Sequence, residues 1–385
     1  MSGWTNYSEL VTSLEISEKN MGNCGSKSVI LNDIAVKEQR VDGSWLSKNL
    51  LGLRCTLRSI ERYSIIKILS NQMNKKRWYS SIAHIPTTVK SNLSPWFITG
   101  FADAECSFSI LIQNNSKYAT GWRIKPIFAI GLHKKDIEIL KMIQSSLGIG
   151  KIHIHGKDSL QFRVDSLEQL KVVINHFENY PLVTAKLADY ILFKKALDII
   201  LLKEHLSEKG LLKLVGIKAS LNLGLSASLK EAYPNWKELQ ISRPDYRFNG
   251  IPDPYWMAGF ASGDSSFNVK IGNTTSLLNK RVQLRFGIGL NIREKAFIQS
   301  LPSFFDLAEG PKNVYFHSNS VRFETVNFLE ITNKIIPFFD KYSIQGKKSL
   351  DFIAFKKVAG VIKCKDHLTP EGLQQILDIK ERMNV

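Results

Sequence analysis

The stretch SPWFITGFADAECSF, at residues 94–108, is a mostly apolar run that ends in two carboxylic acids. Nearly the same stretch returns 159 residues later as DPYWMAGFASGDSSF, at residues 253–267. A buried, isolated charge is costly unless it is paired or binds a cation. The repeat therefore raises the question of what an acid does at the end of an apolar segment, twice in one chain.

Three further pairs of segments repeat in the same order, at offsets between 158 and 162 residues. They are FAIGLHKKDIEIL and FGIGLNIREKAFI (from Phe128 and Phe286), SLQFRV and SVRFET (from Ser159 and Ser320), and FENYPLVTAKLADYILFKK and FDKYSIQGKKSLDFIAFKK (from Phe177 and Phe339). Repeats with such constant spacing indicate an internal duplication, with a period too long for a solenoid.

The duplication divides the chain. We expect a weakly ordered leader at residues 1–93, a first half at 94–235, a linker at 236–252 and a second half at 253–385. The segment YPNWKELQISRPDYRFNGIPDP, which spans the linker, is polar and rich in proline. The leader shares none of the repeats and is broken up by polar, glycine-containing stretches.

Each half predicts the element order αββαββα with an extra helix near its end, which makes the fold class α+β. CSFSILIQN alternates with strand period, so Phe108, Ile110 and Ile112 share one face. In the next run, RIKPIFAIGL, Pro126 cannot donate a hydrogen bond to a neighbouring strand, which indicates an edge position or a bulge. KKDIEILKMIQSSLG has helical spacing and ends at Gly148.

The chain is strongly basic, and the excess is not confined to a tail. Its 385 residues carry a net charge of +17, of which residues 1–93 account for +6. Such a distributed positive charge favours a polyanionic partner, above all nucleic acid. The four cysteines form no CxxC pair, which argues against a zinc knuckle, and no apolar run is long enough to span a membrane.

Small residues recur four positions apart in both copies of the opening stretch: Gly100 and Ala104, and Gly259 and Gly263. On a helix these positions lie on one face, and small residues there let two helices approach closely. We therefore expect the two segments to pack against each other as a seam between the halves.

Glu105 and Asp264 follow the small residues, at the only position of the segment where both copies carry a carboxylate. If the helices pack as expected, the two acids lie side by side and repel each other unless a cation or a shared proton intervenes. Hard oxygen ligands select Mg²⁺ or Ca²⁺, and paired divalent ions commonly hydrolyse phosphodiesters. The alternative for one copy is an ordinary hydrogen-bonded acid at a helix end.

The two segments resemble the paired signature of the LAGLIDADG homing endonucleases in their single-chain, two-motif form, and the chain is most similar to the fungal mitochondrial branch. Against the nine letters of the motif, the copies read ITGFADAEC and MAGFASGDS. The resemblance extends through both halves. It departs from the family where Cys106 and Ser265 replace the glycine that usually follows each acid.

This resemblance implies two αββαββα halves about a pseudo-twofold axis, with antiparallel sheets forming a saddle over double-stranded DNA. It implies that Glu105 and Asp264 bind Mg²⁺ with help from the carbonyls of Ala104 and Gly263. The expected protein is a mitochondrial monomer that makes a staggered double-strand break in a long asymmetric target and so promotes intron homing.

The polar faces of the strands are the expected DNA-reading surface, because their residue types contact base edges and phosphates. The candidates are Ser109, Gln113, Asn115, Lys117, Arg123, Lys125, Asn268, Lys270, Gln283 and Arg285. Lys151 and Lys312 are weaker candidates for assisting the transition state.

Two other functions are compatible with the resemblance. One is an RNA-binding maturase that helps the host intron fold, and the other is a catalytically inactive DNA-binding relic. Retention of both acids favours cleavage, because maturases of the family often lose them.

Overall fold

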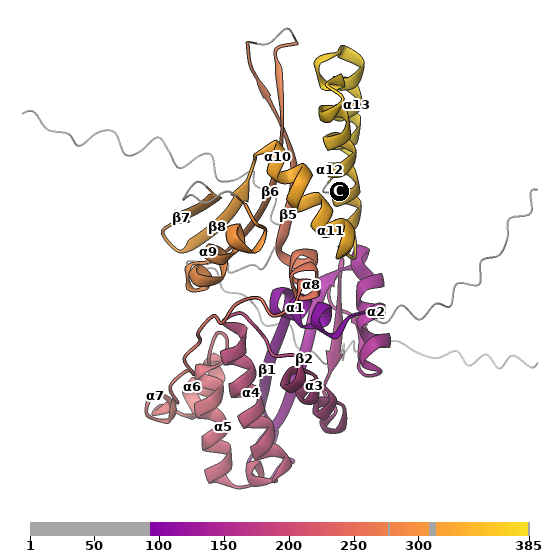
Figure 1. Cartoon of the computed structure of the whole chain (residues 1–385). Helices are drawn as coiled ribbons and strands as arrows, with labels where there is room; N and C mark the ends of the chain where they lie inside the picture. The colour runs from indigo at the N-terminus through magenta and orange to yellow at the C-terminus, as the bar shows by residue number, and fades with distance from the viewer. Residues whose placement is uncertain (1–92, 276–277, 308–312, 384–385) are drawn as a thin grey trace, which may run out of the picture. The chain divides into compact units, whose positions relative to one another are not determined.

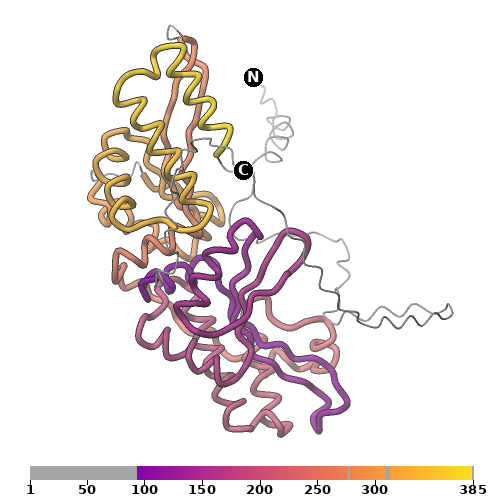
Figure 2. Tube along the Cα trace, turned by 90° about the vertical axis from the view of Figure 1, so that its right-hand side faces the viewer, coloured from indigo at the N-terminus to yellow at the C-terminus, as the bar shows by residue number. Residues whose placement is uncertain are grey.

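A computed structural model describes residues 93–275, 278–307 and 313–383. Except for Leu93, the predicted leader lies outside the described residues. The described chain contains two halves with the same order of helices and strands, which confirms the predicted α+β fold (Figure 1). The chain completes the first half, coloured indigo to pink, before it enters the second, coloured orange to yellow (Figure 2).

The first half contains the expected order and ends in additional helices. Its elements are α1 (Pro95–Glu105), β1 (Cys106–Asn114), β2 (Trp122–His133), α2 (Ile137–Leu147), β3 (Lys151–Ile154), β4 (Ser159–Val164), α3 (Leu167–Asn179), α4 (Lys186–Leu201), α5 (Glu208–Ser220) and α6 (Ala227–Ala232). The short helix α7 (Trp236–Leu239) follows at the start of the predicted linker. The predicted end of α2 is correct, because Gly148 follows it in the left-handed conformation with φ 68°.

The second half repeats this order. Its elements are α8 (Pro254–Asp264), β5 (Ser265–Asn273), β6 (Lys280–Asn291), α9 (Lys295–Phe304), β7 (Val314–His317), β8 (Ser320–Thr325), α10 (Phe328–Glu330), α11 (Ile336–Lys341), α12 (Lys348–Lys363) and α13 (Pro370–Glu381). A short π-helical stretch, Ile331–Ile335, joins α10 to α11.

Each half forms a four-stranded antiparallel sheet, in the orders β1-β2-β4-β3 and β5-β6-β8-β7. The alternation in β1 is as predicted, since Phe108, Ile110 and Ile112 are all buried. Pro126 of β2 pairs with Ile110 on one side, whereas pairing with β4 begins only at Phe128. The proline therefore lies where β2 pairs with only one neighbouring strand, so its lack of an N–H costs no hydrogen bond to β4.

Helices cover the apolar face of each sheet and form two hydrophobic cores. In the first core the ring of Phe108 lies 5.3 Å from Phe128 and 5.4 Å from Phe193, centre to centre. In the second, Phe267 lies 5.0 Å from Phe286 and 5.5 Å from Phe355. The duplicated sequence thus builds two cores of the same kind, each beneath its own sheet.

The two halves meet where α1 packs against α8 (Figure 1). A Cβ atom on Gly100 would stand 1.9 Å from the carbonyl oxygen of Trp256, and one on Gly259 would stand 2.0 Å from that of Phe97. Both distances are too short for a contact between a carbon and an oxygen atom, so neither glycine could be replaced without moving the backbone. The two backbones therefore approach as closely as the spacing of small residues predicts. Gly263 belongs to the same contact, because its Cβ would lie 2.4 Å from that of Ala104.

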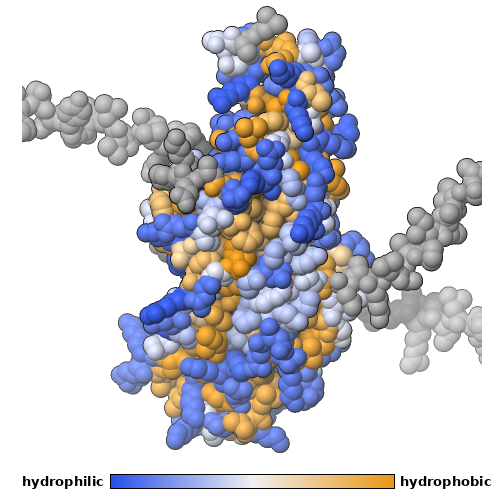
Figure 3. Space-filling view, in the orientation of Figure 1, coloured by the Kyte–Doolittle hydropathy of each residue, from blue (hydrophilic) through white to orange (hydrophobic). Residues whose placement is uncertain are grey.

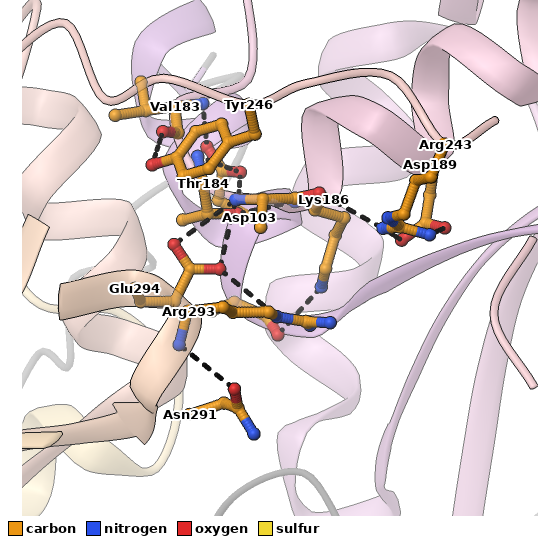
Figure 4. Close-up of polar contacts among 12 residues, drawn as sticks. Asp103, Val183, Thr184, Lys186, Asp189, Arg243, Tyr246, Asn291, Arg293 and Glu294 are labelled. Atoms are coloured by element: carbon orange, nitrogen blue, oxygen red, sulfur yellow. Dashed lines mark hydrogen bonds and ion pairs between the residues drawn. The ribbon is translucent and has the colours of Figure 1, made fainter. Parts of the chain in front are cut away.

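The segment predicted as a linker contacts both halves. It begins with α7 and continues without further helix or strand to α8. Arg243 donates to both carboxylate oxygens of Asp189 at 2.8 and 2.9 Å, and the Tyr246 hydroxyl donates to the carbonyl of Val183 at 2.7 Å (Figure 4). Farther along, Phe248 packs on Phe297 of the second half.

Candidate functional site

The site lies where the two seam helices end. Glu105 is the last residue of α1 and Asp264 the last of α8, and each is followed at once by a strand of its own sheet. The Oε1 atom of Glu105 lies 3.2 Å from the position of a Cβ on Gly263, the neighbour of Asp264. Close packing at the end of the seam therefore brings the two acids into one small region.

Burial raises the pKa of both acids, and the charge of Asp264 adds to the shift of Glu105. Burial, followed by the negative charge of Asp264, raises the pKa of Glu105 to about 7. Burial also raises the pKa of Asp264, while Lys348 and Lys186 oppose the shift. Placing a further cation here would favour the charged form of both carboxylates.

Two lysines contact the main chain beside the acids. The Nζ atom of Lys186, the first residue of α4, donates to the carbonyls of Ala102 at 3.2 Å and Ala104 at 3.1 Å. The Nζ atom of Lys348, the first residue of α12, donates to the carbonyl of Gly263. The carbonyls of Ala104 and Gly263, which the sequence suggested as metal ligands, therefore already accept hydrogen bonds from cations.

The donor set fits a hard divalent cation. It offers two carboxylates and two main-chain carbonyls, all oxygen ligands of the kind that Mg²⁺ and Ca²⁺ prefer. Among the residues that the structure describes, no group of three or more His, Cys, Asp or Glu side chains could hold a metal. An ion at this site would therefore complete its shell with the carbonyls, with water, or with oxygen atoms of a bound phosphate.

Asp103 has a structural role. Its Oδ2 accepts hydrogen bonds from the Val183 N–H and the Trp256 Nε1–H, both at 2.8 Å. Its Oδ1 accepts from the Thr184 N–H at 3.1 Å and from the Thr184 hydroxyl at 2.6 Å. Both oxygens are saturated by donors of the protein, so this acid is not available for a cation.

The residues after the acids have ordinary backbones. Cys106 has φ −82° and Ser265 has φ −106°, both in the extended region. Only a positive φ would require glycine there. The replacement of the usual glycines therefore introduces no backbone strain next to the acids.

The sequence profile of the LAGLIDADG endonucleases matches residues 98–197 and 257–359, so that each match begins within one of the two seam helices. The chain belongs to the LAGLIDADG endonuclease family. A relative from Neurospora crassa, "Probable intron-encoded endonuclease 3", is 39% identical over 98% of this chain and 72% of its own length. "Probable intron-encoded endonuclease 2" of the same fungus is 35% identical over 83% of this chain and 73% of its own length.

Solved structures of LAGLIDADG endonucleases share the fold of both halves. The meganuclease I-CpaMI bound to uncleaved DNA is 75% identical, with a TM-score of 0.74 over 76% of this chain and 99% of that one. I-SmaMI bound to cleaved DNA is 39% identical, with a TM-score of 0.72 over 76% of this chain and 97% of that one. I-SmaMI has also been solved on an uncleaved DNA target in the presence of calcium ions.

The polar residues suggested for DNA reading share one face in each sheet. In the first LAGLIDADG half, Gln113 lies opposite Arg123 across the β1–β2 pair. In the second, Asn268 lies opposite Arg285 and Lys270 opposite Gln283. Figure 3, which has the orientation of Figure 1, shows hydrophilic residues over both halves, with apolar residues among them.

The remaining candidates lie on this face or beside it. Ser109 and Lys125 belong to β1 and β2, and Asn115 and Lys117 lie in the turn between these strands. The register adds Arg163 and Arg322 to the faces, opposite Ala129 and Gly289.

Carboxylates hold several of these cations. Asp165 contacts Lys125 at 2.7 Å and Arg163 at 3.0 Å. In the second half, Glu324 contacts Arg285 at 3.4 Å and Arg322 at 2.7 Å. Asp165, directly after β4, and Glu324 of β8 therefore each pair with two cations of one face.

Sequence reasoning missed the two lysines of the site. It suggested Lys151, which is exposed on the edge strand β3, and Lys312, which lies outside the described residues. A signal was present, because Lys186 and Lys348 are related by the same offset of 162 as the repeated segments that contain them. Their distance from the acids along the chain hid the connection.

No helix in the described part of the chain has the length and apolar character of a membrane span.

Proposed function

We propose that this LAGLIDADG protein is a site-specific, Mg²⁺-dependent endonuclease that makes a staggered double-strand break in a long, asymmetric DNA target. The observation that carries the proposal is the duplicated site. Two partly buried acids end the seam helices, and each has a lysine on the main chain beside it. A duplicated site suits a substrate with two equivalent bonds to break, one in each strand.

Glu105 and Asp264, with the carbonyls of Ala104 and Gly263, would hold the metal. When bound, Mg²⁺ supplies an activated water and offsets the charge that develops on the phosphate. Lys186 uses two of its three ammonium hydrogens on carbonyls of α1. The third can donate to a phosphate oxygen, where a fixed positive charge stabilises the transition state.

The polar faces of the two sheets would bind the DNA. They carry arginine, lysine, asparagine and glutamine, the types that contact phosphates and base edges. In the free protein the acids Asp165 and Glu324 pair with four of these cations. DNA phosphates would then compete with the acids for the same side chains.

The setting we propose is intron homing in a fungal mitochondrion by a monomer. The similarity to intron-encoded endonucleases of Neurospora crassa supports it, and two halves within one chain provide both catalytic centres. Both acids of the motif are retained, which favours cleavage over the alternatives of an RNA maturase or an inactive relic.

The test replaces each acid by its amide, in Glu105→Gln and Asp264→Asn. The amide keeps the shape but removes the charge that holds the cation. The rate of double-strand cleavage should therefore fall on the order of a thousandfold, which corresponds to the loss of several kcal/mol of transition-state stabilisation. DNA affinity should stay near the parental value, because the sheets make most of the contact. One remaining acid leaves slow nicking of a single strand.

Two substrates serve as probes: the DNA bound in the I-CpaMI complex, and the intronless allele that spans the intron insertion point. Each is placed in a supercoiled plasmid, and intact, nicked and linear forms are separated on a gel. Ca²⁺ in place of Mg²⁺ should permit binding and stall cutting. If both variants linearise the plasmid at the parental rate, Glu105 and Asp264 do not hold the metal.

A further inference from the structure

The start of α4 is held by an acid from the opposite half. Ala185, which precedes Lys186, donates its backbone N–H to the carboxylate of Glu294, at 3.1 Å to Oε1 and 3.3 Å to Oε2 (Figure 4). Glu294 comes directly before α9 in the second half and is only 6% exposed. The contact joins residues 109 positions apart, so it exists only because the halves are packed together.

A matching contact joins the start of α12, in the second half, to an acid of the first half. Lys347, which precedes Lys348 at the start of α12, donates its N–H to Oδ1 of Asp136 at 2.7 Å. Asp136 comes directly before α2 in the first half. Asp136 and Glu294 occupy matching positions of one repeated segment, and Ala185 and Lys347 occupy matching positions of another. The duplication therefore carries a reciprocal pair of contacts across the seam.

The backbone around the second contact is shaped for it. Gly346 has φ +71°, a conformation that other residues seldom adopt. A Cβ atom there would stand 2.9 Å from Oδ1 of Asp136, so a side chain would crowd the acid. Glycine at this position allows the carboxylate to reach the N–H of the next residue.

The chain before each lysine is also fixed by its own half, two residues earlier than the contact across the seam. Asp103 of α1 accepts from the Val183 N–H, and the hydroxyl of Ser262 in α8 accepts from the Gln345 N–H at 3.0 Å. The residues before each lysine thus donate hydrogen bonds to the seam helix of the same half and to an acid of the other half. This double contact sets the position of the lysine backbone and hence the reach of its Nζ atom.

We propose that Glu294 and Asp136 are positioning residues, which place Lys186 and Lys348 respectively from across the seam. The inference rests on the proposed function, in which the two lysines act on the phosphates. It adds that each lysine is aligned by the half that does not carry it. Neither lysine would then be correctly placed until both halves are packed.

The experiment measures the cleavage rate of each DNA strand separately, with the full chain, Mg²⁺ and the duplex of the I-CpaMI complex labelled on one strand at a time. Lys186→Met and Lys348→Met first assign each lysine to the strand that it slows more. Glu294→Ala should then slow the strand assigned to Lys186, and Asp136→Ala the strand assigned to Lys348. A misplacement of about 1 Å predicts losses of about tenfold to a hundredfold in that strand.

Conservative variants and a neighbouring acid are the controls. Glu294→Gln and Asp136→Asn keep an oxygen that accepts the N–H, so they should restore most of the lost rate. Glu138→Ala removes another acid at the start of α2, whose ion pair is with the exposed Lys141 of the same helix, and should leave both strands unchanged. DNA affinity with Ca²⁺ and the melting temperature show whether each variant is folded.

The outcomes separate the two proposals. If the parental protein cuts and the lysine variants are strand-selective, but Glu294→Ala and Asp136→Ala slow both strands equally or neither, the positioning role is overturned. If Glu294→Ala does not fold, the test rests on the contact between Asp136 and Lys347, which is half-exposed. Asp136→Ala, and the rescue of its rate by Asp136→Asn, then decide the positioning role. If the parental protein does not cut, or the lysine variants leave both rates unchanged, it is the proposed function that fails.

Discussion

Single buried polar groups hold the helices around the site in place. Asp103 accepts a hydrogen bond from Trp256 across the seam, in addition to those from its own half. On the neighbouring helix α3, the ring of His176 lies 3.1 Å from the Thr99 hydroxyl, which itself donates to the Tyr180 carbonyl at 2.9 Å. Since the hydroxyl has given its one hydrogen, the His176 Nε2–H is the donor to Thr99.

The burial of His176 predicts a stability that depends on pH. Burial lowers the pKa of His176 to about 4, below its ordinary value of 6.5. The unfolded chain therefore takes up a proton before the folded one, so stability is full above about pH 6.5 and is lost as the pH falls toward 4. The loss is at most about 3 kcal/mol, and less because the ring is partly exposed.

His176→Gln tests this, because glutamine can donate to Thr99 but does not titrate. Urea unfolding at pH 7.5, 6 and 5 gives the free energy of unfolding of both proteins. The parental protein should lose more stability than the variant between pH 7.5 and pH 5. Parallel pH profiles would show that His176 is not the titrating group.

Among the elements, the α1–α8 pair sets the geometry of the whole site. Its glycines bring the backbones together, and this contact places the ends of the two helices, and so both acids, side by side. The lysine helices α4 and α12 are then attached to the seam through the residues that precede them. A change in helix spacing would therefore displace acids and lysines together.

Gly100→Ala and Gly259→Ala should destabilise the protein, even though alanine is the better helix former. The new methyl groups would stand about 2 Å from main-chain carbonyl oxygens. Backbone atoms within a helix cannot move aside as a flexible side chain can. We expect a loss of about 1–3 kcal/mol or more, as for overpacking in cores.

Gly360→Ala is the matched control, because Gly360 also lies within a helix but has no atom within 4 Å of a new Cβ. It should be neutral or stabilise by up to about 1 kcal/mol. Chemical unfolding of the three variants provides the comparison. Equal effects at all three glycines would contradict close packing at the seam.

For the whole molecule, the duplication accounts for the chain from about Ser94 onward. The two halves and the linker between them carry +11 of the net charge of +17, and the leader the remainder. Both sheets with their polar faces, both acids and both lysines belong to the halves. DNA binding should therefore be a property of the halves, and phosphate contacts should make it weaken as salt increases.

A chain that begins at Ile85 should bind its target with unchanged affinity and an unchanged dependence of log Kd on log salt concentration. Fluorescence anisotropy at several salt concentrations, with Ca²⁺ to prevent cutting, measures both quantities. A large loss of affinity together with a shallower slope would show that the leader adds phosphate contacts of its own.

Patterns that repeat within a few residues were sufficient to predict much of this protein. Strand alternation in CSFSILIQN, small residues four apart, and the acid that follows them are local features, and the duplication showed each of them twice. From these the sequence predicted the α+β halves and the α1–α8 seam, which the structure confirms. The roles of Glu105, Asp264 and the strand residues stay predictions, which the amide variants and DNA binding would test.

The contacts that complete the site were decided only by the tertiary structure. Lys186 reaches a carbonyl 82 positions earlier in the chain, and Glu294 accepts an N–H from 109 positions away. Hydrogen bonds between distant segments leave no periodic pattern, since either partner alone looks like any polar residue at a helix end. They form because packing of two helices brings four separate segments to one point, and that geometry is a property of the folded molecule.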